Sequence, residues 1–88
     1  MNKKIPARLY WACRRGMLEL DILLEHFLKE KYLHLSVQDK QIFVQLLSIE
    51  DQDLFMWLMG KQAPERLFKD IIEKIRYHAS TRHSASSF

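Results

Sequence analysis

The stretch LELDILLEHFLKEKYL, residues 18–33, decides the fold class of this chain. Large apolar residues recur in it at helical spacing, and five polar residues lie elsewhere on the helical wheel: Glu19, Glu25, His26, Lys29 and Glu30. This pattern predicts an amphipathic helix that buries one face against a core. The apolar face consists of Leu20, Leu23, Leu24, Phe27 and Leu28.

The segment before this stretch predicts a first helix. Pro6 suits a helical first turn, because its missing N–H would have no partner there, so the helix runs from that point to about Arg15. Gly16 then ends or bends it, since glycine inside a helix costs about 1 kcal/mol relative to alanine. The first two helices are therefore expected to meet at the glycine.

Two more helices are predicted in the middle of the chain. Ser36 and Asp39 resemble a capped helix start, because the hydroxyl accepts from an early N–H and the acid lies in the first turn. This third helix runs to about Leu47. A fourth helix spans about residues 51–59, and Gly60 stops it. It has almost no polar face, so it is either central to the bundle or part of a docking surface, and we expect the core.

A fifth helix opens at Pro64, which again suits a first-turn position. We expect it to fray near Tyr77, because the following residues lose helical periodicity and are rich in serine. Residues 80–88 are therefore predicted to form a mobile tail. The apolar face of the fifth helix consists of Phe68, Ile71, Ile72 and Ile75.

Composition agrees with this series of helices. The chain has 88 residues, of which 48% are hydrophobic and 28% charged, with only two glycines and two prolines, which disfavours a turn-rich all-β fold. A chain of this length forms one domain. We predict an all-α fold, a compact five-helix bundle forming a single domain over residues 1–79, followed by the tail at residues 80–88.

Charge is unevenly distributed along the chain. Residues 1–15 carry five basic and no acidic residues, residues 16–59 three basic and eight acidic, and residues 60–88 six basic and three acidic. A basic end of this kind suits an acidic partner, a nucleic acid or a phosphate-bearing ligand. The sign of the charge does not choose among them.

The sequence lacks the residue patterns that disulfides, phosphate-binding loops, membrane-spanning helices and metal sites require. Cys13 is the single thiol, so no internal disulfide forms and the chain suits the cytosol; we expect a small apolar contact there rather than a nucleophile. Two distant glycines cannot build a phosphate cradle. No segment approaches the about 20 apolar residues of a membrane-spanning helix. The histidines lack the spacing of a metal site and are expected to be solvated at the surface: His26, His34, His78 and His83.

One face of the first helix has the composition of a docking surface. Arg8, Trp11, Ala12 and Arg15 are spaced three, four and seven residues from the first of them, so they share that face. Arginine and tryptophan dominate the energetics of protein interfaces. The alternative is a solvated basic face with Trp11 tucked beneath it.

Gly16 has two competing explanations. It is either a hinge between two helices, or it lets the backbone of another chain come close and lets Arg15 and Glu19 turn toward one side. We expect both of those residues at the surface, so that alanine at either position leaves folding nearly intact. If close approach at a negative φ explains the glycine, Gly16→Ala costs little stability.

The residues RRGMLELD, with Arg15, Gly16 and Glu19, resemble the Arg-Gly-x-x-Glu signature of the succinate dehydrogenase flavinylation factors, a family of small five-helix assembly proteins. The likeness continues through QIFVQLL and EDQDLFMWLMG and covers roughly residues 7–60. Two departures stand out: Gln52 occupies a position where relatives often have proline, and the chain after Gly60 matches only as a loosely amphipathic helix.

The resemblance implies a chaperone-like assembly factor rather than an enzyme. Such a factor binds the flavoprotein subunit of succinate dehydrogenase, or of the similar fumarate reductase, and promotes covalent attachment of FAD to a histidine of that partner. Because the sequence has neither a phosphate cradle nor a cluster of metal ligands, we expect the chain to hold no FAD or metal stably by itself, and we expect a cytoplasmic monomer. The partner-binding residues carried over or placed beside the signature are Arg8, Trp11, Arg15, Gly16, Glu19 and Asp21.

Two alternatives come from other classes of protein. One is a basic helical module that binds nucleic acid through the first helix, although the eight acids of residues 16–59 would repel phosphate. The other is an antitoxin-like or regulatory partner protein, because docking surfaces are reused among unrelated functions.

Overall fold

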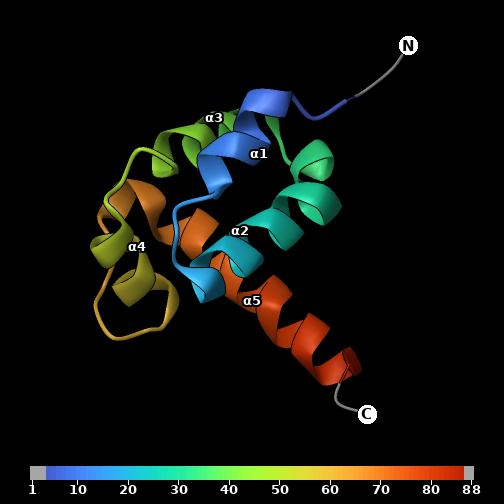
Figure 1. The fold of residues 1–88 in the computed structure, drawn as a ribbon. Helices are drawn as coiled ribbons and strands as arrows, with labels where there is room; N and C mark the ends of the chain where they lie inside the picture. The colour runs from blue at the N-terminus through green and yellow to red at the C-terminus, as the bar shows by residue number, and fades with distance from the viewer. Residues whose placement is uncertain (1–3, 87–88) are drawn as a thin grey trace.

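A computed structural model of the chain describes residues 4–86, with side chains described for residues 4–81. Within that range the chain is all helix, turn and loop, which confirms the predicted all-α fold of five helices in one domain. α1 lies against α2, and α5 packs behind α2 and extends toward the C-terminus (Figure 1). The elements are α1 (Ala7–Cys13), α2 (Leu18–Lys31), η1 (Tyr32–His34), α3 (Val37–Leu46), α4 (Asp51–Leu58), η2 (Arg66–Phe68) and α5 (Lys69–Ser86).

The apolar faces of these helices meet in one core. The predicted face of α2 is buried except for Leu23, which is partly covered. Phe27 of α2 packs on Phe43 of α3 with 5.6 Å between ring centroids, and Trp57 of α4 stacks on Phe68 at 5.9 Å. Each large apolar side chain contributes about 1.5–3 kcal/mol when fully buried. The prediction that α4 belongs to the core is therefore confirmed.

α1 ends earlier than predicted. Its last helical residue is Cys13, because Arg14 adopts an extended backbone conformation (φ −89°, ψ 106°) and its N–H donates to the carbonyl of Trp11. Arg15 consequently leaves the helical face that it was expected to share with Arg8 and Trp11. The start of α3 agrees with the prediction, since Ser36 Oγ accepts from the Asp39 N–H at 3.0 Å.

α5 differs from the prediction at both ends. A 3-10 turn follows Pro64, so α5 begins only at Lys69, and the helix continues past Tyr77 to Ser86. Residues 80–86 are helical, residues 87–88 lie outside the described range, and the mobility of the tail stays a prediction.

His78 explains why α5 continues past Tyr77. It is 5% exposed, so the expectation that it is solvated at the surface is wrong. Its ring lies edge-on to Phe27, and its Nε2 is 2.7 Å from Glu30 Oε1 on α2. The additional turn of α5 therefore has its own buried contact with α2.

Candidate partner-docking site

The turn between α1 and α2, residues 14–17, contains the signature glycine. Gly16 has a φ of +90°, a conformation that costs residues with a Cβ about 1–2 kcal/mol. A Cβ built at Gly16 would meet no described atom within 4 Å beyond its chain neighbours. From the sequence, Gly16→Ala is expected to cost little stability only if φ is negative, and that condition is not met. The space beside the glycine is open.

Asp21 holds this turn from the first turns of α2. Its Oδ1 accepts from the Arg15 N–H at 2.8 Å, and its Oδ2 accepts from the Gly16 N–H at 3.3 Å. The carboxylate thereby satisfies two backbone donors that the turn leaves unpaired, and its position near the helix N-terminus is electrostatically favourable. Both oxygens of Asp21 therefore bind the chain itself.

Arg15 points into the molecule, and its side chain is only 11% exposed. Its guanidinium donates to the carbonyls of Leu47 at 2.8 Å and Ile49, and forms an ion pair with Asp51 at the start of α4. With a further hydrogen bond to the Ala12 carbonyl at 3.2 Å, four separate acceptors hold the planar group, an arrangement that suits the forked donors of arginine. The expectation that Arg15 is a surface residue is therefore wrong, because the early end of α1 turns the side chain toward the connection between α3 and α4.

The other predicted site residues lie at the surface. Arg8 and Glu19 are exposed, and the side chain of Trp11 is 72% exposed, which contradicts the alternative that it tucks beneath a basic face. Tryptophan is enriched at the energetic centres of protein interfaces, so the exposed Trp11 remains a candidate contact residue. The six predicted residues thus fall into two groups. Arg15 and Asp21 bind other parts of the chain, and four residues are exposed to solvent: Arg8, Trp11, Gly16 and Glu19.

Two further apolar residues near the turn, Leu18 and Ile22, are absent from the predicted site. Both are exposed on α2, although their residue types are typical of a core. A signal for them exists in the sequence: on the helical wheel they lie away from the face of Leu20, Leu24 and Leu28 that the core buries. They extend the exposed surface beside Gly16 along α2.

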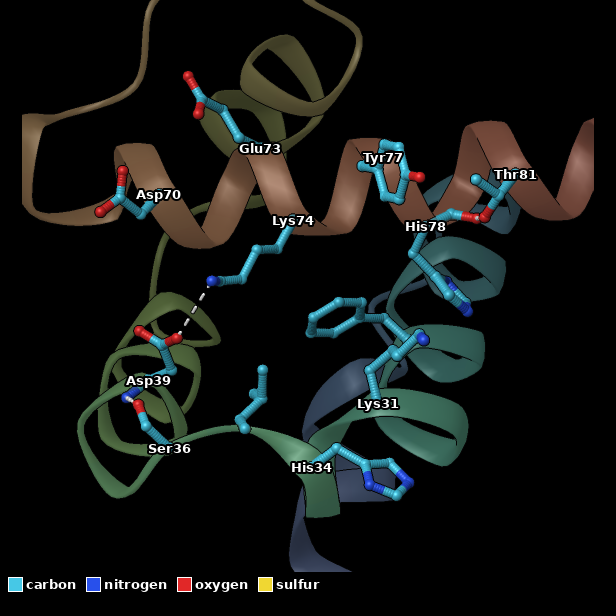
Figure 2. Close-up of a pocket in the computed structure, with 12 residues that line it drawn as sticks. Lys31, His34, Ser36, Asp39, Asp70, Glu73, Lys74, Tyr77, His78 and Thr81 are labelled. Carbon is cyan, nitrogen blue, oxygen red and sulfur yellow. Dashed lines mark hydrogen bonds and ion pairs between the residues drawn. The ribbon is translucent and has the colours of Figure 1, made fainter.

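A groove of about 670 Å³ lies elsewhere, between α5 on one side and α2, η1 and the start of α3 on the other. Figure 2 shows Lys74 of α5 reaching toward Asp39 of α3, with Nζ and Oδ2 3.5 Å apart. Phe27, Lys31 and His78 border the same groove. None of the predicted site residues lines it.

Residues 4–81 include a buried thiol and no cluster of metal-ligating side chains. Cys13 is buried, and that burial raises the pKa of its thiol to about 12, so the apolar contact predicted for it agrees with its position. Across the described side chains no three His, Cys, Asp or Glu residues gather as a metal site would require. No helix within residues 4–86 is long and apolar enough to cross a membrane.

Comparison with known proteins gives a consistent assignment. A relative from Coxiella burnetii, "FAD assembly factor SdhE", is 49% identical over 82 residues, which are 91% of this chain and 100% of the relative. A relative of the same name from Idiomarina loihiensis is 48% identical over 77 residues, 88% of this chain and 83% of the relative. The solution structure of a UPF0350 protein superposes with a TM-score of 0.74 at 39% identity, covering 89% of this chain and 84% of that one.

The family model described as "Flavinator of succinate dehydrogenase" matches residues 7–79, which include every helix except the last turns of α5. This match is longer than the likeness of residues 7–60 seen in the sequence motifs, and it takes in the fifth helix. The chain therefore belongs to the succinate dehydrogenase flavinator family.

Proposed function

We propose that this chain is an assembly factor that binds the flavoprotein subunit of succinate dehydrogenase and promotes the covalent attachment of FAD to it. The observation that carries the proposal is the family match over residues 7–79, together with relatives that are named FAD assembly factors. Neither the nucleic-acid-binding nor the antitoxin-like alternative finds support among these relatives.

The partner contact is proposed for the outward residues Arg8, Trp11, Gly16 and Glu19. Their exposure leaves them available to another protein, and the open space beside Gly16 allows a partner backbone to approach closely. Arg15 and Asp21 were expected to touch the partner. In this proposal they contribute indirectly, because their hydrogen bonds fix the conformation of the turn that the partner contacts.

The chain contributes positioning rather than a catalytic residue in this proposal. Its one thiol is buried and protonated at neutral pH, so it supplies no nucleophile. Holding a flavin and a histidine of the partner in reactive geometry accelerates their reaction without further chemistry from the factor. The flavin belongs to the partner, and the isolated chain binds neither FAD nor a metal tightly; titration calorimetry of the isolated chain with each tests this.

Co-expression tests the proposed function directly. The flavoprotein subunit of succinate dehydrogenase is produced in cells lacking their own factor, with or without this chain, and covalent flavin is read as in-gel fluorescence of the denatured subunit. We expect strong fluorescence only with the chain present. Equal fluorescence in both samples would contradict the proposal. The same assay with the fumarate reductase flavoprotein tests whether it is a second partner, and light scattering tests the expected monomer.

A further inference from the structure

Three large apolar side chains lie exposed on neighbouring helices beside the Gly16 turn. Leu18 and Ile22, 74% and 43% exposed, are one helical turn apart on α2, and Trp11 of α1 is also largely exposed. Glu25, the next residue of α2 on that face, lines a surface hollow together with Trp11. Leu18, Ile22 and Glu25 thus share one face of α2, and Glu25 lies beside Trp11 of α1. We name the exposed apolar residues Trp11, Leu18 and Ile22 the α1–α2 apolar patch.

Charges of opposite sign flank this patch. Arg8 and Arg14 are exposed on and just after α1, whereas Glu19 and Glu25 lie on α2. An apolar centre with a charged rim is the usual anatomy of a protein interface, in which burial of the centre supplies most of the affinity and the rim fixes orientation. A partner that fits this surface has an apolar centre, acidic groups facing α1 and basic groups facing α2.

We propose that the α1–α2 apolar patch is the main contact with the succinate dehydrogenase flavoprotein, an inference that rests on the proposed function. The patch is continuous with the Gly16 turn, since Leu18 lies two residues beyond the glycine and next to Glu19. Arg15 cannot supply the contact energy, because its guanidinium is occupied by acceptors of the chain itself. Removal of three large apolar side chains from water thus drives docking, and the charges orient it.

The chain offers a closely matched control for this proposal. Val37 is 73% exposed and is the first residue of α3, just as Leu18 is the first residue of α2. Leu67 of η2 is 51% exposed and stands as the control for Ile22. Both control residues lie outside α1 and α2. Glutamine at these positions removes apolar surface without adding charge.

Binding of the purified flavoprotein subunit is measured for the wild type, for the double variant Leu18→Gln with Ile22→Gln, and for the control Val37→Gln with Leu67→Gln. We expect the patch variant to bind about tenfold more weakly or worse, and the control within about twofold of wild type, while both melt cooperatively. Equal affinities of the two variants would overturn the proposal.

Ionic strength provides a second measurement on the wild type. Affinity that changes little between low and high salt supports an apolar contact, whereas a steep loss would show that the charged rim carries the affinity and would overturn the proposal. A wild-type chain that neither binds the subunit nor raises its covalent flavin contradicts the proposed function itself, and the patch proposal falls with it. If only the patch proposal is wrong, the wild-type chain still binds the subunit and raises its covalent flavin.

Discussion

Nε of Arg15 lies 2.5 Å from Oδ1 of Asp51, a residue 36 positions further along the chain. The same guanidinium donates to the carbonyls of Leu47 and Ile49, so it joins the turn between α1 and α2 to the connection between α3 and α4. The arginine and the glycine of the signature therefore face opposite environments. The arginine side chain points into the fold, whereas Gly16 faces solvent.

Arg15→Ala is expected to lower the free energy of unfolding by about 2 kcal/mol, because it leaves three backbone carbonyls and a carboxylate without their charged donor. Chemical denaturation followed by circular dichroism measures this. The adjacent Arg14→Ala is the control: Arg14 is exposed, so its removal should change stability by about 0.5 kcal/mol or less. Equal stability of the two variants would contradict the structural role of Arg15.

Gly16→Ala is expected to destabilise the chain by about 1 kcal/mol, because the positive φ disfavours any residue with a Cβ. Gly16→Arg should cost a similar amount, since its longer side chain extends into open space. Thermal melts of both variants measure the strain.

Partner binding separates the two explanations of this glycine. If the backbone of the flavoprotein passes close to Gly16, the arginine variant loses binding in co-purification, while the alanine variant, which adds one methyl group, retains most of it. If Gly16→Arg binds as well as Gly16→Ala, the glycine serves conformation alone.

Glu19→Ala should fold normally and lower covalent flavin in the partner about fivefold or more, because Glu19 is exposed beside the turn. In-gel flavin fluorescence of the co-expressed flavoprotein reports the effect. Glu73→Ala on α5 is the matched control, being an exposed glutamate outside α1 and α2. A Glu19 variant that supports flavin attachment as well as this control would exclude Glu19 from the docking surface.

Cys13 should resist thiol reagents at neutral pH in the folded chain and react after unfolding, because burial raises its pKa from 9.0 to about 12. Between pH 9.0 and about 12 the unfolded thiol loses its proton while the folded thiol keeps it. The free energy of unfolding therefore falls as the pH rises through this range. Denaturation of the wild type and of Cys13→Ala across that window measures the difference. An equal pH dependence of the two proteins would show that the thiol does not contribute.

The sequence by itself determined the helical class and the composition of the core. Apolar spacing depends only on 3.6-residue periodicity, so the buried faces of α2 and α5 could be named without knowing what covers them. Local chemistry likewise set the start of α3 at Ser36 and the stop at Gly60, because capping and positive φ involve only neighbouring residues. The signature and its neighbours sufficed to indicate the family.

Only the tertiary structure decided whether certain side chains point into the fold or toward solvent. Arg15 and Asp51 are too far apart in sequence for any local pattern to pair them, and the end of α1 two residues earlier than predicted turned the arginine side chain into the fold. His78 follows Ile71 and Ile75 at helical spacing, but only the structure shows that α5 continues past Tyr77 and packs this histidine against Phe27 of α2. Exposure of Trp11 is a similar case: the residue type is typical of a core, and only the packing of α1 leaves this side chain at the surface.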